Sequence, residues 1–180
     1  MNYLDKISDI KNIGVRKIIE NNIIGLEITY INFSGLKITS IIEVNKRIEL
    51  QTINVFNELL DIKFPINNVS VANGRTDRDI IIANDTTSFN YRKVAGKNVL
   101  SKHAFGLSID LNPKNNPAKP SSMSEIYDES IEIGKINQDV INIFKNNGFK
   151  WGGEIFGNFK DNHHFEVDFN TREKLLNKLI

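Results

Sequence analysis

Hydrophobic and polar residues alternate in two neighbouring stretches of the chain. Residues 26–31 place Leu, Ile and Tyr at every second position, and residues 36–44 repeat the same pattern. Because successive side chains of a strand point to opposite faces, both stretches are predicted to be strands. The Asn-Phe-Ser-Gly sequence at residues 32–35 is typical of a turn. We therefore predict a β-hairpin.

The period changes to that of a helix after residue 44. An apolar stripe along residues 45–62 predicts an amphipathic helix, formed by Ile48, Thr52, Val55, Leu59 and Ile62. Pro65 follows it, and a residue before proline resists the α conformation. A second helix is predicted around residues 136–144, where Asn146-Asn147-Gly148 supplies a C-cap sequence. Shorter helices are predicted around residues 15–19 and over residues 171–180.

Two further segments alternate like strands, residues 106–111 and residues 164–169. Residues 113–125 hold three of the four prolines and are predicted to form a surface loop. Helices and strands are mixed without a regular βαβ order. This pattern favours an α+β fold with a mainly antiparallel sheet and flanking helices.

The composition excludes several classes of protein. The 180 residues suit one compact domain, and a net charge of +1 with scattered lysines gives no sign of nucleic-acid binding. No stretch is apolar enough to span a membrane, and no secretory signal is visible at the start. The chain has no cysteine. A metal site must therefore use histidine nitrogen and carboxylate oxygen.

All three histidines fall within two motifs that also carry carboxylates. Residues 101–113 hold the first, and residues 151–166 hold the other two. A catalytic zinc ion takes three protein ligands and leaves a fourth position for water or substrate. The alternative is a purely structural role, with the histidines at the surface or in the core and the carboxylates in turns. The coincidence of residue types favours a zinc hydrolase.

Strand geometry shows how such ligands would converge. Asp110 lies on the polar face of its strand, and His164 lies on the polar face of the other. If the two strands are neighbours, these side chains meet, and His103 enters from the loop before Gly106. The tandem pair cannot point both rings at one metal, so His163 or His164 has another role. The histidine of this pair that does not bind the metal would line the substrate cleft or have no role in the chemistry.

Three other side chains are candidates for the chemistry. Asp161, three residues before His164, would accept a proton from the attacking water and pass it to the leaving amine. Arg92 is the preferred cation for the developing oxyanion, ahead of Arg75 and Arg78. Trp151, beside two glycines, is either a core aromatic or a wall of the substrate site.

These motifs resemble a known family. The zinc peptidases of bacterial cell-wall peptides carry a similar pattern, matched here by Ser101-x-His103-x-x-Gly106-x-x-x-Asp110, Trp151-Gly152-Gly153 and Asp161-x-x-His164-Phe165-Glu166. The family includes D-Ala-D-Ala carboxypeptidases, D-Ala-D-Ala dipeptidases and the L-alanyl-D-glutamate endopeptidases of phage endolysins. Matching segments run from about residue 43 to residue 168. The resemblance implies the fold shared by these peptidases and hedgehog domains, with a catalytic domain over residues 41–180 and a segment of uncertain role over residues 1–40.

Site residues follow from the resemblance position by position. It implies zinc as cofactor, with His103, Asp110 and His164 as ligands, and Asp161 as the general base. Arg92 falls near the arginine that stabilises the substrate, although the match is looser there. His163 stays outside the ligand set, and Ser101 would contact either the substrate or the ligand residues. Apart from the resemblance, Trp151 and His163 are the other contacts expected for substrate. Ser108 departs from the family, which usually has alanine at that position.

The expected partner is a peptidoglycan stem peptide. Asp161 matches the endolysin-like branch, since the dipeptidase branch carries Glu there. We therefore expect an L-alanyl-D-glutamate endopeptidase that stays in the cytoplasm until it reaches the cell wall. The alternatives are a D-Ala-D-Ala carboxypeptidase or dipeptidase, and a non-catalytic zinc-containing binding module on the same fold. A structural protein with incidental histidines would bind no stoichiometric metal. The sequence predicts no oligomeric state.

Overall fold

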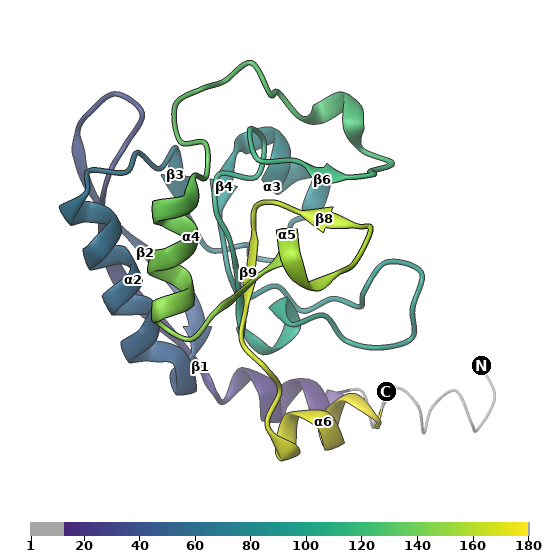
Figure 1. The fold of residues 1–180 in the computed structure, drawn as a ribbon. Helices are drawn as coiled ribbons and strands as arrows, with labels where there is room; N and C mark the ends of the chain where they lie inside the picture. Colours follow the sequence, from purple (N-terminus) through teal and green to yellow (C-terminus); the bar gives the residue numbers. More distant parts are fainter. Residues whose placement is uncertain (1–12, 180) are drawn as a thin grey trace.

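A long antiparallel hairpin opens the fold in the computed structural model, which describes residues 13–179 (Figure 1). Residues 13–20 are helical, as predicted around residues 15–19. Strand β1 (Ile23–Ile31) then pairs with β2 (Lys37–Asn45), with Leu26 opposite Ile42. Asn32 holds the turn, because its side-chain oxygen accepts the backbone N–H groups of Ser34 and Leu36. The predicted hairpin is confirmed, although β1 begins before residue 26, where Gly25 interrupts the alternation.

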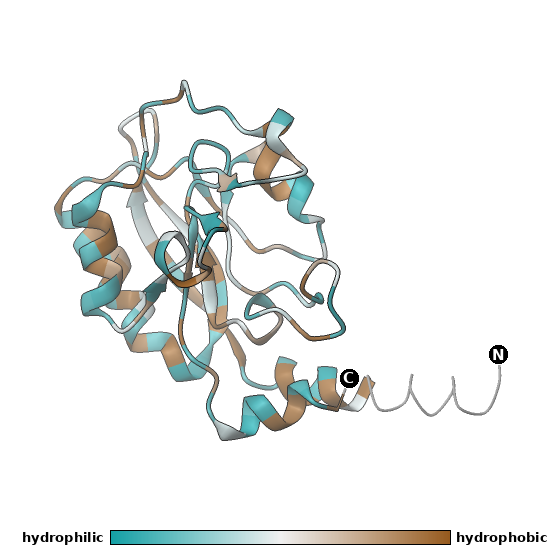
Figure 2. Cartoon of the chain, turned by 45° about the vertical axis from the view of Figure 1, so that its right-hand side comes forward, coloured by the Kyte–Doolittle hydropathy of each residue, from teal (hydrophilic) through white to brown (hydrophobic). Residues whose placement is uncertain are grey.

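Two helices cover one side of the molecule. Helix α2 (Glu49–Asp61) follows the short 3-10 turn η1 (Lys46–Ile48) and lies beside β1 and α4 (Gln138–Asn146) (Figure 1). Figure 2 shows polar and apolar residues on opposite sides of these helices, as amphipathic helices require. Both helices are confirmed. The placement of Ile62 on the apolar stripe was wrong: it follows the end of α2 and is 50% exposed.

The remaining strands are short and form three small sheets. The central sheet has the order β5 (Ser108–Asp110), β9 (His164–Glu166), β7 (Lys150–Trp151), and both of its pairings are antiparallel. Strands β6 (Ala118–Lys119) and β8 (Lys160–Asp161) are also antiparallel. Only β3 (Asn68–Val69) and β4 (Asp85–Thr86) run parallel within the described part of the chain. The predicted α+β class with mainly antiparallel pairing is confirmed.

Several short helices complete the structure. Helix α6 (Thr171–Asn177) begins at an Asn170 cap, as predicted for this region. The loop after β6 contains the 3-10 turn η3 (Ser124–Ile126), and α5 (Gly152–Ile155) lies between β7 and β8. Helix α3 (Asp77–Ala83) was not predicted. The sequence feature that could have predicted this helix is the capping box of Thr76 and Asp79 before a run of isoleucines.

One core joins the hairpin to the central sheet. Leu26, Ile28 and Tyr30 of β1 belong to the same buried cluster as Ile109 and Phe165. The hairpin crosses residue 40, so residues 23–40 belong to the structural unit that carries the histidine motifs; the first twelve residues lie outside the description. No helix within residues 13–179 is long and apolar enough to cross a membrane.

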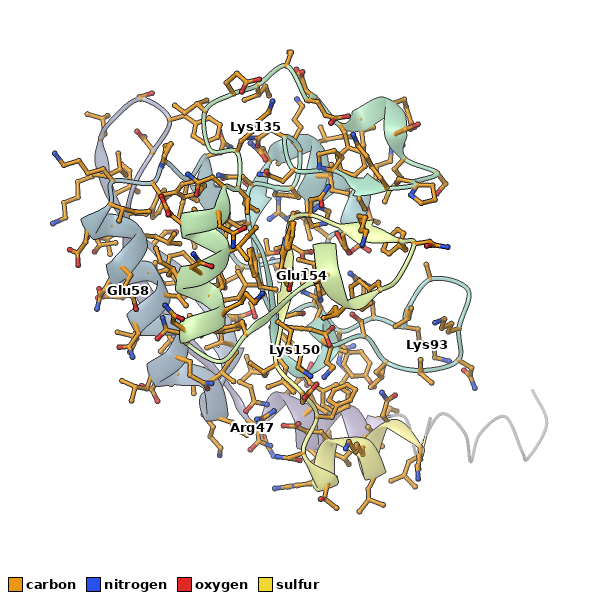
Figure 3. All side chains as sticks on the ribbon, viewed as in Figure 1. Arg47, Glu58, Lys93, Lys135, Lys150 and Glu154 are labelled. Carbon is orange, nitrogen blue, oxygen red and sulfur yellow. The ribbon has the colours of Figure 1, made fainter. Side chains whose placement is uncertain are left out.

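An ion pair fastens α6 to the end of the hairpin. Arg47 donates from Nε to Glu173 Oε1 at 3.1 Å and from a terminal nitrogen to Glu173 Oε2 at 3.0 Å. Arg47 also donates to the carbonyl oxygen of Asp168. Figure 3 shows Arg47 between the hairpin and α6. This contact holds the chain that leaves β9 against the body of the fold.

Candidate metal centre

The pairing of two strands sets two candidate ligands face to face. In the antiparallel register of β5 and β9, Asp110 lies directly opposite His164. Phe165, the neighbour of His164, is fully buried and anchors β9 in the core. The alternation of side chains therefore turns the polar face of both strands toward one point, as strand geometry predicts.

The third candidate ligand comes from a tight turn against the hairpin. His103 begins the 3-10 turn η2 (His103–Phe105), which ends at Gly106 with φ +62°. A Cβ at Gly106 would lie 2.7 Å from the backbone nitrogen of Asn45, so a larger residue does not fit there. Asn45 donates its side-chain amide to the carbonyl oxygen of Phe105. The end of β2 thus fixes the turn that carries His103.

These three side chains converge on one point. His103 Nε2 lies 3.1 Å from Asp110 Oδ2, and His164 Nδ1 lies 2.9 Å from Asp110 Oδ1. The two ring nitrogens are 3.2 Å apart. One ligand atom from each residue lies within 4.8 Å of the others, an arrangement that could hold a metal ion. Ligand atoms of a tetrahedral zinc ion are about 3.3 Å apart, so the nitrogen and oxygen set fits zinc.

Outer hydrogen bonds assign the proton on each ring. His103 Nδ1 lies 2.7 Å from the carbonyl oxygen of Ser88, which can only accept. His164 Nε2 lies 3.2 Å from Glu166 Oε2. Each ring therefore donates its outer N–H and turns its other nitrogen inward. This arrangement of outer acceptors is common behind metal-bound histidines.

The charges within this cluster shift its ionisation. Burial alone would raise the pKa of the Asp110 carboxyl, but the His103 and His163 imidazoles, with hydrogen bonds from His103 and His164, hold it well below its usual range. Burial opposes the charged form of His164, yet hydrogen bonds to Asp110 and Glu166 outweigh it and raise the pKa of His164 to about 10. Before it binds metal, the cluster therefore holds a proton that a metal ion must displace.

Asp161 lies beside the cluster with one carboxylate oxygen free. Its Oδ1 is buried and has no hydrogen-bond partner among residues 13–179, although His163 Nε2 approaches to 3.1 Å. The His163 ring is held from its other side, where Nδ1 donates to the carbonyl oxygen of Asn116 at 2.7 Å. Buried polar atoms are rarely left unpaired, so Asp161 Oδ1 is suited to an incoming water.

The two glycines after Trp151 allow this close packing. A Cβ at Gly152 would lie 2.5 Å from the carbonyl oxygen of Asp161 and 3.1 Å from His164 Cβ. A Cβ at Gly153 would lie 2.4 Å from the Trp151 ring. Trp151 Nε1 donates to the carbonyl oxygen of Asn162 at 2.9 Å. Trp151 thus braces the loop of Asp161, and it is not among the described residues that line the cleft.

A cleft of about 900 Å³ opens over the cluster. Its walls come from residues 77–177 and include the candidate ligands, Asp161, His163, Ser101, Arg92, Tyr127, Phe156 and Phe159. Phe156 and Phe159 are each 39% exposed, and the Phe156 ring centroid lies 5.8 Å from that of His164. Burial raises the pKa of the Tyr127 hydroxyl, which therefore stays a hydrogen-bond donor at neutral pH. The cleft offers a peptide both polar and aromatic surfaces.

Ser101 and Arg92 are coupled across the cleft wall. Ser101 is buried; its Oγ accepts the backbone N–H of His103, and its own N–H donates to the carbonyl oxygen of Arg92. Arg92 Nε lies 2.7 Å from Asp77 Oδ1. The less favoured arginines lie elsewhere. Arg75 pairs with Asp85 and Arg78 pairs with Glu125, and neither lines the cleft.

Comparison with known proteins points to a peptidase. Residues 95–167 match the model of a family described as D-alanyl-D-alanine carboxypeptidase. The matched segment contains His103, Asp110, Asp161 and His164, and it leaves Arg92 and the hairpin outside. No curated protein and no solved structure matches the chain. The match supports a hydrolase that acts on peptides related to peptidoglycan.

Proposed function

We propose that this protein is a zinc-dependent peptidase of peptidoglycan stem peptides, and that it cleaves the L-alanyl-D-glutamate bond. One observation carries the proposal: His103, Asp110 and His164 converge beside Asp161, whose buried Oδ1 has no hydrogen-bond partner within residues 13–179. These residues line a cleft and lie within the segment similar to a peptidase family. A purely structural cluster would need neither the cleft nor the free carboxylate oxygen.

The three ligands suit a catalytic zinc ion, because they leave one coordination position for water or substrate. A zinc ion held there would polarise the scissile carbonyl and acidify a water molecule. Asp161 then accepts the proton of the attacking water at Oδ1 and delivers it to the leaving amine.

Arg92 would stabilise the negative charge that develops on the carbonyl oxygen. Its Nε lies 2.7 Å from Asp77 Oδ1 as an ion pair without hydrogen-bond geometry, and this pair holds the guanidinium at the cleft wall. An arginine has five N–H donors, so the terminal nitrogens remain available for substrate. Ser101 and His163 line the same cleft and are proposed as substrate contacts. Trp151 is assigned the bracing role described above, in place of a substrate wall.

Two features favour an endopeptidase. Asp161 has the shorter side chain that the endolysin-like branch carries at the position of the general base. The cleft volume of about 900 Å³ lies near the upper end of the range for ligand sites, which leaves room for residues on both sides of the scissile bond. A carboxypeptidase requires less space beyond the cleaved bond.

Mass spectrometry of defined stem peptides tests the proposal. Zinc-loaded protein should split the peptide after L-alanine, and the Asp161→Asn variant should leave it intact. Loss of a terminal D-alanine instead would make the protein a carboxypeptidase. Binding of one zinc per chain without any cleavage would identify a non-catalytic zinc module.

A further inference from the structure

Lys102, next to His103 in the chain, turns its side chain away from that histidine and toward β9. The side chain is only 15% exposed. Its ammonium donates to the carbonyl oxygen of Val167 at 2.6 Å and lies 3.9 Å from the centre of the Phe169 ring. Buried lysines are uncommon because removing the charge from water is costly. The burial of the Lys102 ammonium therefore calls for a structural or functional reason.

The explanation lies in Glu166, the carboxylate behind His164. Glu166 Oε1 lies 3.6 Å from Lys102 Nζ, while Glu166 Oε2 lies 3.2 Å from His164 Nε2. Only 13% of the Glu166 side chain is exposed. One carboxylate thus joins a lysine from the turn before His103 to the ring of His164. The contacts form a chain from one histidine segment to the other.

This chain has two geometric consequences. Glu166 accepts the Nε2 proton of His164, which keeps Nδ1 directed toward Asp110. Lys102 holds Glu166 in that position and adds a side-chain tie between the segment of His103 and the strand of His164, beside the backbone hydrogen bond from Val167 to Leu107. Outer carboxylates behind metal-bound histidines commonly change metal affinity by 10–100-fold when they are removed.

We propose that Lys102 is a positioning residue for the metal centre, acting through Glu166 to fix the ring of His164 relative to His103. The inference rests on the proposed function, since it assumes that the two histidines bind one metal ion. Lys102 would then be a part of the metal centre that supports the ligands without touching the ligand atoms themselves.

Zinc affinity, measured by competition with a chromophoric chelator, tests this role. Lys102→Met should weaken zinc binding by about 10–100-fold, and Lys102→Arg should restore most of the affinity because it keeps the cation. The visible spectrum of bound Co²⁺ should change in Lys102→Met, since the ring of His164 is no longer fixed. Lys150→Met is the matched control: Lys150 pairs with Asp168 at 2.7 Å on the exposed side of the same region (Figure 3). It should bind zinc like the parent protein.

A double-mutant cycle shows whether Lys102 acts through Glu166. Glu166→Gln should itself weaken zinc binding, and adding Lys102→Met to it should cause little further loss. This comparison also serves if Lys102→Met alone proves too unstable in chelator. Unchanged zinc affinity and an unchanged Co²⁺ spectrum in Lys102→Met would overturn the proposal, as would a full effect of Lys102→Met in the Glu166→Gln background. Failure of the parent protein to bind zinc would instead refute the proposed function.

Discussion

Asp110 and His164 face each other across an antiparallel strand pair, with Asp110 Oδ1 2.9 Å from His164 Nδ1. The β-sheet register therefore creates the centre, because any one-residue slip of β9 would turn His164 into the core and Phe165 out. His103 is then the only candidate ligand held by a turn. Its position depends on Gly106 and on the end of β2.

Removing His103 should abolish the stabilisation that zinc confers. A ligand that binds only the folded state raises stability by RT ln(1 + [L]/Kd), which is about 2.7 kcal/mol at a hundredfold excess over Kd. The Tm of the parent protein should therefore rise when zinc replaces chelator, whereas the Tm of His103→Ala should not. Asp168→Asn, on an exposed side chain, is the control and should respond like the parent. An equal zinc response in His103→Ala would exclude this residue as a ligand.

Replacing Asp161 should separate metal binding from catalysis. Asp161→Asn keeps the size of the side chain but cannot accept the proton, and loss of a general base costs about 10²–10⁴ in rate. Stem-peptide cleavage should fall by that factor, while zinc affinity stays near that of the parent protein. The exposed Glu154, paired with Lys145, provides a matched control as Glu154→Gln. Full activity in Asp161→Asn would move the base to Glu166, which lines the same cleft.

The hydrophobic pattern predicted the main elements and the facing of two ligands. Period-two alternation located the hairpin, and the strand pattern around Asp110 and His164 predicted that they would meet. The strands are nevertheless shorter than the pattern indicated. β5 lies between Gly106 and Asn112, which both have positive φ, and this backbone conformation ends extended structure.

The contacts that support the ligand residues from outside could not be predicted from the sequence. Lys102 meets Glu166 across more than sixty residues of chain, and no periodicity records such a pairing. The role of Trp151 stayed open because it depends on a tight turn, where Gly153 lies against its ring and Asn162 accepts its N–H. Sequence motifs therefore identified the residue types at the centre, while their support appears only in three dimensions.

Zinc affinity should depend on pH through His164. In the metal-free protein the pKa of His164 is raised to about 10, so at neutral pH zinc must displace its proton. Affinity should therefore fall about tenfold for each unit of pH below neutrality. Competition titrations across this range measure the slope. Flat affinity between neutral and acidic pH would argue against histidine ligands.

The same pKa makes an opposite prediction for the stability of the metal-free protein. Since the folded-state pKa of His164 lies above its usual value of 6.5, protonation of this group stabilises the fold below about pH 6.5, and the contribution is lost as pH rises through about 10. Denaturant unfolding in chelator should show this loss on the alkaline side. Zinc-loaded protein should lack it, because His164 then binds metal in its neutral form. An equal alkaline loss in both forms would assign it to other groups.

Gly152 should tolerate no side chain. The Cβ of Gly152→Ala would lie 2.5 Å from the carbonyl oxygen of Asp161 and would displace the loop that carries Asp161 and His164. Forcing a methyl group into a packed site costs about 1–3 kcal/mol. The free energy of unfolding and the cleavage rate should both fall. Gly14→Ala is the control, because nothing lies within 4 Å of its added Cβ. Equal stability of the two variants would mean that the loop can shift freely.

Arg92 should affect catalysis without affecting the metal. Its main-chain carbonyl still accepts the N–H of Ser101 after substitution, so the cleft wall should persist in Arg92→Met. Loss of a donor to the oxyanion costs about 10²–10³ in kcat. We expect that loss in stem-peptide cleavage, with unchanged zinc affinity. Arg78→Met, which removes an exposed pair with Glu125 away from the cleft, should keep full activity. If Arg92→Met also keeps its kcat, the stabilising cation must be sought in Lys97 or Lys102, which line the same cleft.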